Sequence, residues 1–161
     1  MPGSRLSGMA GIGVDATSNL ADQSQDGAIL RLENLDTDLR PPPGVEEATQ
    51  QAVAEDHANS YLPFLGADAL RKAAAALVSR LFGMHYDWNN STIVSAGSLN
   101  GILNVLVALL EPRDEVLLTD PIYIGPINRV RLAGGVPADA PYHTEDGVWR
   151  LDCDQLRQTV T

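Results

Sequence analysis

The stretch Thr92-Ile93-Val94-Ser95-Ala96-Gly97-Ser98 decides the fold, because a β-branched run meets small residues and then an apolar helical pattern. Thr92–Ser95 is short and β-branched, which predicts a buried strand. A helix is predicted over Ser98–Glu111, since apolar residues recur there at helical spacing. These residues are Leu99, Ile102, Leu103, Leu106, Val107 and Leu110. With a second buried strand at Val116–Leu118, the pattern predicts a parallel βαβ unit with a right-handed crossover.

The turn between the first predicted strand and its helix has the composition of an anion site. Small residues there expose backbone N–H groups at a helix N-terminus, and phosphate is the usual anion. Gly97 would permit close approach and Ser98 would add a hydroxyl, although Ser98 is equally well explained as a plain N-cap. A P-loop is excluded because the only lysine is Lys72, and a dinucleotide loop is excluded because the turn offers only Gly97 and Gly101.

Composition places the chain among ordinary globular proteins and excludes several functions. The 161 residues are 44% hydrophobic and carry a formal net charge of −10, which disfavours nucleic acid and anionic membranes as partners. The single cysteine, Cys153, excludes an intrachain disulfide, and the three histidines lack metal-ligand spacing, so no metal site is expected. No apolar run approaches the roughly 20 residues that span a bilayer. A cytoplasmic location is therefore expected.

The rest of the chain predicts a flexible N-terminal arm over residues 1–27 and a single fold over 28–161. A short strand is predicted at 28–32, and a turn at Asp146-Gly147. Helices are predicted at 44–57, 67–82, 98–111, 124–132 and from 154 onward, and further strands at 92–95, 116–118, 136–140 and 148–151. This alternation predicts an α/β fold with three layers, α/β/α, around a mostly parallel sheet.

Several short motifs also follow one another in a fixed order. They are Tyr61-Leu62-Pro63 with Gly66, Leu70-Arg71, Ser95-Ala96-Gly97-Ser98, Leu109-Leu110-Glu111-Pro112-Arg113-Asp114-Glu115-Val116, Asp120-Pro121-Ile122-Tyr123 and Leu132-Ala133-Gly134-Gly135, preceded by Leu32-Glu33-Asn34 and a proline cluster. This succession resembles the pyridoxal-phosphate-dependent aminotransferases of class I and II, which have fold type I. The resemblance covers about residues 28–161 and implies an incomplete large domain of that fold.

The resemblance implies pyridoxal 5′-phosphate as the cofactor and gives roles to five residues. Gly97 and Ser98, with the Leu99 amide, would hold the cofactor phosphate. Tyr123 would lie on one face of the pyridine ring, and the alternative is that it is an ordinary core aromatic. Tyr61 would reach the phosphate of the neighbouring subunit, which implies a homodimer, and the alternative is that its ring packs against its own loop.

The resemblance further implies transfer of an amino group from an amino acid to a 2-oxo acid. That chemistry needs a lysine that forms a Schiff base with the cofactor, an aspartate beside the pyridine nitrogen and an arginine for the substrate carboxylate. In the family all three follow the matched region, and Lys72 does not occupy the lysine position. We therefore expect an N-terminal part of such an enzyme, inactive by itself and without catalytic residues.

Two other functions stay open at this point. A truncated, non-catalytic paralogue could serve as a dimerisation or interaction module that keeps the surface around Tyr61. The other hypothesis is an unrelated, doubly wound nucleotide-binding domain. Only this hypothesis predicts that a nucleotide binds in preference to pyridoxal phosphate.

Overall fold

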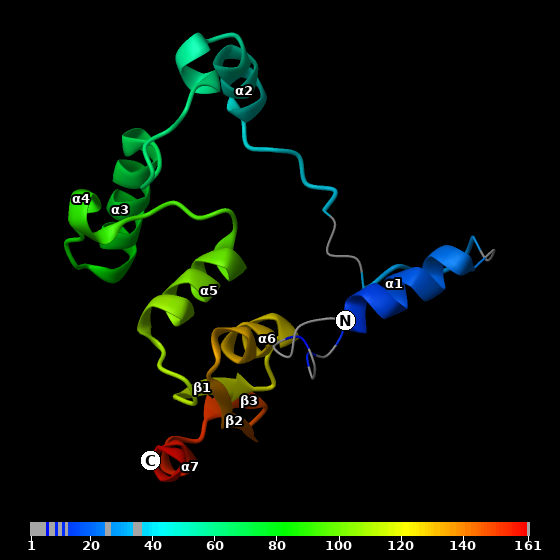
Figure 1. Cartoon of the computed structure of the whole chain (residues 1–161). Helices are drawn as coiled ribbons and strands as arrows, with labels where there is room; N and C mark the ends of the chain where they lie inside the picture. The colour runs from blue at the N-terminus through cyan, green and yellow to red at the C-terminus, as the bar shows by residue number, and fades with distance from the viewer. Residues whose placement is uncertain are drawn as a thin grey trace. The chain divides into compact units, whose positions relative to one another are not determined.

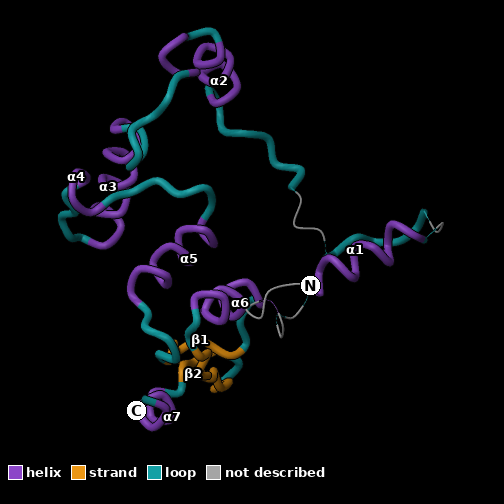
Figure 2. Tube along the Cα trace, viewed as in Figure 1, coloured by secondary structure: helices purple, strands orange, loops and turns teal. Residues whose placement is uncertain are grey.

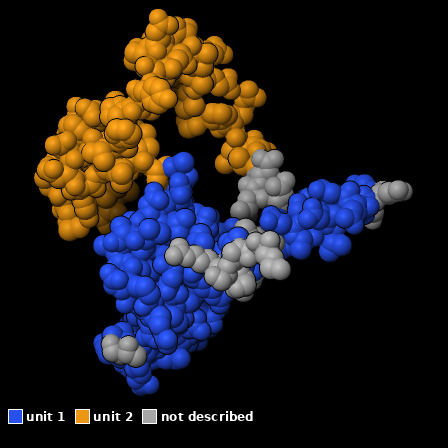
Figure 3. All heavy atoms as spheres, viewed as in Figure 1, with its two compact units in different colours: residues 1–34, 96–161 blue, residues 35–95 orange. Residues whose placement is uncertain are grey.

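The computed structural model describes residues 6, 9, 11, 13–24, 27–33 and 37–160. It divides into two compact units, unit 1 with residues 1–34 and 96–161 and unit 2 with residues 35–95 (Figure 3). The elements, all but η2 labelled in Figure 1, are α1 (Gly13–Gln23), α2 (Val45–Val53), the 3-10 helix η2 (Asp56–Asn59), α3 (Asp68–Phe82), α4 (Trp88–Ser91), α5 (Ser98–Leu109), β1 (Glu115–Asp120), α6 (Ile124–Ala133), β2 (Val136–Glu145), β3 (Val148–Leu151) and α7 (Cys153–Thr159).

Unit 1 contains a mixed sheet in the order β1-β2-β3. β1 and β2 are parallel, with Glu115 opposite Val136, and α6 connects them and contacts both. β2 and β3 are antiparallel around Asp146 and Gly147, whose φ angles of 51° and 75° are those of a two-residue hairpin turn. The predicted strands at 116–118, 136–140 and 148–151 are therefore confirmed, and β2 is longer than expected.

The predicted first strand, Thr92–Ser95, is wrong. These residues are drawn as loop in Figure 2, and the Val94 N–H donates to the Leu65 carbonyl oxygen at 3.0 Å without forming a ladder. The β-branched composition favours extended backbone, but a strand also needs a neighbouring strand, and none of the described residues supplies one. The βαβ unit consequently lies one step later, in β1, α6 and β2.

The helices of both units follow local signals closely. α3 ends at Gly83 and α6 at Gly134, whose φ angles of 66° and 94° are the left-handed conformation of a helix C-cap. α2 is shorter than predicted and η2 follows it. The short α4 was not predicted, although the Asp87 carboxylate caps it by accepting a hydrogen bond from the Asn89 N–H at 3.1 Å.

A buried arginine organises unit 2. Arg71 on α3 is 3% exposed. Its Nε donates to the Thr92 carbonyl oxygen at 2.8 Å, and its Nη2 donates to the carbonyl oxygens of Asn89 at 2.8 Å and Trp88 at 3.2 Å. The guanidinium also lies 5.1 Å from the centre of the Trp88 ring. One side chain thus connects α3 with α4 and with the segment that follows α4.

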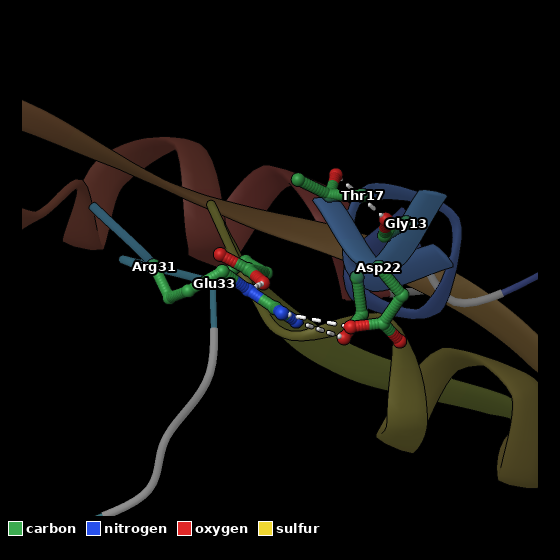
Figure 4. A network of polar contacts seen from close by, with 6 residues as sticks. Gly13, Thr17, Asp22, Arg31 and Glu33 are labelled. Atoms are coloured by element: carbon green, nitrogen blue, oxygen red, sulfur yellow. Dashed lines mark hydrogen bonds and ion pairs between the residues drawn. The ribbon is translucent and has the colours of Figure 1, made fainter. Parts of the chain in front are cut away.

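The segment predicted as a flexible arm contains a helix, α1, in its described residues. The Thr17 hydroxyl donates to the Gly13 carbonyl oxygen at 3.1 Å within this helix (Figure 4). Residues 28–32 form no strand. Instead Arg31 donates to Asp22 of α1 at 2.7 Å and is also paired with Glu33. The motif residue Asn34 lies outside the described residues.

These contacts shift two pKa values in opposite directions. The pKa of Arg31 is raised, chiefly by its hydrogen bond to Asp22 and then by the bond to Glu33. The pKa of Glu33 is lowered, chiefly by a hydrogen bond from its own backbone and then by the bond from Arg31. Both groups are therefore held in their charged forms.

The apolar helix α5 leaves much of its surface exposed. None of its residues is buried, and Val105, Val107 and Leu109 are 56%, 63% and 75% exposed. The buried apolar residues of the described chain are few and small, namely Ala75, Val130 and Ala140. Apolar surface of this extent is typical of a face that packs against further structure.

Candidate functional site

Helix α5 begins at Ser98, as predicted, and its N-terminus carries no side-chain cap. Gly97 is the N-cap residue, with φ 87° and ψ 152°, a conformation that favours glycine. Ser98 is thus the first helical residue, and the alternative that it is a plain N-cap is wrong. The first helical hydrogen bond joins the Gly101 N–H to the Gly97 carbonyl oxygen at 3.1 Å, so the preceding N–H groups have no partner within the helix.

Tyr123 lies immediately before α6, and its side chain is 50% exposed. A Cβ atom added to Gly125 would come within 2.5 Å of the Tyr123 ring and 3.2 Å of the Leu99 side chain. The ring therefore lies over the Gly125 backbone, beside the side chain of the second residue of α5. A half-exposed ring does not fit the alternative that Tyr123 is an ordinary core aromatic.

Arg129 joins the first turns of the two helices. Its Nε donates to the Leu99 carbonyl oxygen at 2.7 Å, and its Nη1 donates to the Gly125 carbonyl oxygen at 3.1 Å. The sequence prediction missed both Gly125 and Arg129. Their spacing of four residues places them on one face of a helix, but nothing local indicates that this face meets Leu99, 30 residues earlier.

Two further residues of interest lie in unit 2. Tyr61 is fully exposed, at 103%, so its ring does not staple the loop around it. The Lys72 ammonium lies 4.5 Å from the centre of the Trp88 ring, a cation–π contact. The structure therefore brings Leu99 and Tyr123 together in unit 1, where Gly97 and Ser98 directly precede Leu99, and it describes Tyr61 separately.

The geometry in unit 1 fits a ligand that combines an anion with a flat ring. The N–H groups of the first turn of α5, which have no partner within the helix, attract a phosphate, because they point out of its N-terminal end and the helix dipole is positive there. The half-exposed Tyr123 ring, backed by Gly125, offers a face for stacking. A phosphate ester of an aromatic heterocycle, such as pyridoxal phosphate, has both features.

The described residues contain no group of three or more histidine, cysteine, aspartate or glutamate side chains that could hold a metal ion. Within the same residues, no helix has the length and apolar character that a membrane crossing requires. These two results concern the described part of the chain only.

Comparison with known proteins gives consistent matches. The family described as "Aminotransferase class I and II" matches residues 30–161. The aspartate/prephenate aminotransferase of Thermus thermophilus is 32% identical over 124 residues, which cover 77% of this chain and 31% of that protein. Kynurenine–oxoglutarate transaminase 3 of Mus musculus is 30% identical over 161 residues, covering 94% of this chain and 34% of that protein.

A solved structure agrees with these relatives. The structure of N-succinyldiaminopimelate aminotransferase from Mycobacterium tuberculosis superimposes with a TM-score of 0.85 at 31% identity, covering all of this chain and 41% of that one. The chain thus spans about a third of the length of the curated relatives it matches, and it carries part of the fold type I architecture. This family depends on pyridoxal phosphate. The chain belongs to the class I and II aminotransferase family.

Proposed function

We propose that this chain is the part of an aminotransferase that binds the phosphate and one ring face of pyridoxal phosphate. Gly97, Ser98 and the Leu99 amide would bind the phosphate, and Tyr123 would stack on the pyridine ring and shield it from water. The observation that carries the proposal is the convergence of the Tyr123 ring and Leu99 over Gly125, beside an uncapped helix N-terminus.

The chemistry of amino transfer would come from the bound cofactor, whose ring would act as an electron sink, and it would also need a lysine that binds the cofactor covalently. The only lysine of this chain, Lys72, lies in unit 2 against the Trp88 ring. We propose that this chain by itself transfers no amino group. Its residues position the cofactor, while the amino acid and 2-oxo acid are substrates of a complete enzyme.

The test is a comparison of two ligands that differ only in the phosphate. Pyridoxine 5′-phosphate and pyridoxine both lack the aldehyde, so neither can react with Lys72 or the N-terminal amine. An anion at a helix N-terminus contributes about 1–2 kcal/mol, so we expect the phosphate ester to bind about 5- to 30-fold more tightly in equilibrium dialysis.

Two variants locate the binding site. Tyr123→Ala should weaken the binding of both ligands, because it removes the stacking face. Tyr142→Ala, which removes a tyrosine paired with Trp149 instead, is the matched control and should bind both ligands as the unchanged chain does. Equal affinity of the unchanged chain for the two ligands, or tighter binding of a nucleotide, would refute the proposal.

A second function, self-association, is favoured by the loop around Tyr61. Tyr61 and Phe64 are fully exposed and Leu62 is 60% exposed, which is unusual for large apolar side chains so close in sequence. We propose that this loop contacts a second copy of the chain, as the resemblance implies for Tyr61. Sedimentation analysis should show a dimer whose dissociation constant rises in the Tyr61→Ser, Phe64→Ser double variant, and a concentration-independent monomer would contradict this.

A further inference from the structure

Arg129 occupies an unusual place for a cation. It is half-buried between the first turns of α5 and α6, where its guanidinium donates to the carbonyl oxygens of Leu99 and Gly125. In the described part of the chain no carboxylate oxygen lies within 4.0 Å of it. The partners of this side chain are therefore backbone dipoles, and its positive charge is not neutralised by an acidic residue.

This charge lies close to the positive end of the α5 dipole. Leu99 is the second residue of the helix, so the guanidinium is bound within the first turn, which rises about 5.4 Å. A cation there adds to the partial positive charge at this end of the helix dipole, which is unfavourable until an anion binds nearby. The combination favours a doubly charged phosphate more strongly than the helix end would by itself.

Arg129 and Gly125 also fix the relative position of the two contacts proposed for the cofactor. They lie one turn apart on α6, and both contact Leu99. Arg129 donates a hydrogen bond to the Leu99 carbonyl oxygen, and the Gly125 backbone lies against the Leu99 side chain. The Tyr123 ring rests on the same glycine. The distance between the Tyr123 ring and the start of α5 is therefore set by the contacts of Gly125 and Arg129.

We propose that Arg129 is a positioning residue for the cofactor. It holds the start of α5 against the helix that follows Tyr123, and its charge strengthens phosphate binding there. The inference rests on the proposed function, because it concerns the same site. It adds a residue that neither the sequence motifs nor the comparisons with relatives indicate.

The experiment measures the ratio of the affinities for pyridoxine 5′-phosphate and pyridoxine in the full chain. This ratio does not change when a variant is partly unfolded, since loss of folded protein lowers both apparent affinities equally. Arg129→Gln removes the charge and the forked donor, and Arg129→Lys keeps the charge but not the fork. Arg131→Gln is the matched control, because Arg131 lies on the same helix, is exposed and has no side-chain partner among the described residues.

We expect Arg129→Gln to lower the ratio about threefold to fivefold, Arg129→Lys to lower it by less, and Arg131→Gln to leave it unchanged. An unchanged ratio in both Arg129 variants, while the unchanged chain prefers the phosphate ester, would overturn the role of Arg129 and leave the proposed function standing. A ratio of one in the unchanged chain would refute the proposed function, and this inference with it. An equal fall in Arg131→Gln would show a general effect of net charge and would also overturn the inference.

Discussion

The contacts of Arg71 allow the cost of a single substitution to be worked out. Its guanidinium donates to three carbonyl oxygens, those of Trp88, Asn89 and Thr92, while its stem is buried in unit 2. Arg71→Met keeps an apolar side chain of similar length but removes all three hydrogen bonds. The substitution therefore separates the polar role of Arg71 from its packing.

A hydrogen bond to a charged group contributes about 1.5–3 kcal/mol when the loss leaves a buried partner unpaired. Here Asn89 is exposed and Trp88 and Thr92 are half-buried, so water can reach the carbonyl groups that are left unpaired. The average for ordinary hydrogen bonds, about 1 kcal/mol each, is therefore appropriate. We expect unit 2 to lose about 3 kcal/mol of its free energy of unfolding.

The assay is urea denaturation monitored by the fluorescence of Trp88. The Trp149→Phe substitution is included in every variant, so that the only tryptophan signal comes from unit 2. With a slope of about 2 kcal/mol per M, the expected loss lowers the midpoint by about 1.5 M. Arg80→Met is the matched control, because Arg80 lies on the same helix, is exposed and has no side-chain partner among the described residues. A midpoint change below about 0.5 M in Arg71→Met would refute the reasoning, since it would mean that water fully replaces the guanidinium.

Two further substitutions test other parts of the structure. Gly125→Ala places a Cβ atom 2.5 Å from the Tyr123 ring, so the ring must move; we expect a loss of about 1–3 kcal/mol and a changed near-ultraviolet circular dichroism spectrum, whereas Gly27→Ala, with no atom within 4 Å, should change neither. The pKa of Glu33 is lowered in the folded chain, so the ionised carboxylate adds to the free energy of unfolding. This contribution is present above the ordinary glutamate pKa of about 4.3 and is lost as the pH falls through the lower pKa of the folded chain. The protection factors of the α1 amide groups, which correct for the pH dependence of intrinsic exchange, should therefore fall on acidification in the unchanged chain, and Glu33→Gln should remove that part of the pH dependence; an identical profile in both would contradict it.

Most helices could be predicted from the sequence because their signals are local. The apolar spacing of α3 and α6 and the glycines that end them, Gly83 and Gly134, lie within the elements themselves. The structure of Thr92–Ser95 could not be predicted this way, because a strand depends on a neighbouring strand, which can come from any part of the chain. The burial of Arg71 could not be predicted either, since the carbonyl groups that accept its hydrogen bonds lie 17 to 21 residues away in the sequence.

The candidate site likewise combines features that the local sequence predicts with features that depend on distant contacts. The start of α5 at Ser98 follows from the small residues of the turn and the apolar run after it. The roles of Gly125 and Arg129 depend on how α5 packs against α6, and that packing has no signature in either helix. The resemblance to a family indicated Tyr123, but only the structure shows that a glycine two residues later carries its ring.

The exposed apolar surface of α5 has a calorimetric consequence. The heat capacity increase on unfolding arises mainly from apolar groups that become hydrated, and it is about 12–15 cal/mol/K per residue in ordinary domains. In α5, side chains such as Val107 and Leu109 are already hydrated in the native state. The increase per residue should therefore fall below that range, and the free energy of unfolding should curve only gently with temperature.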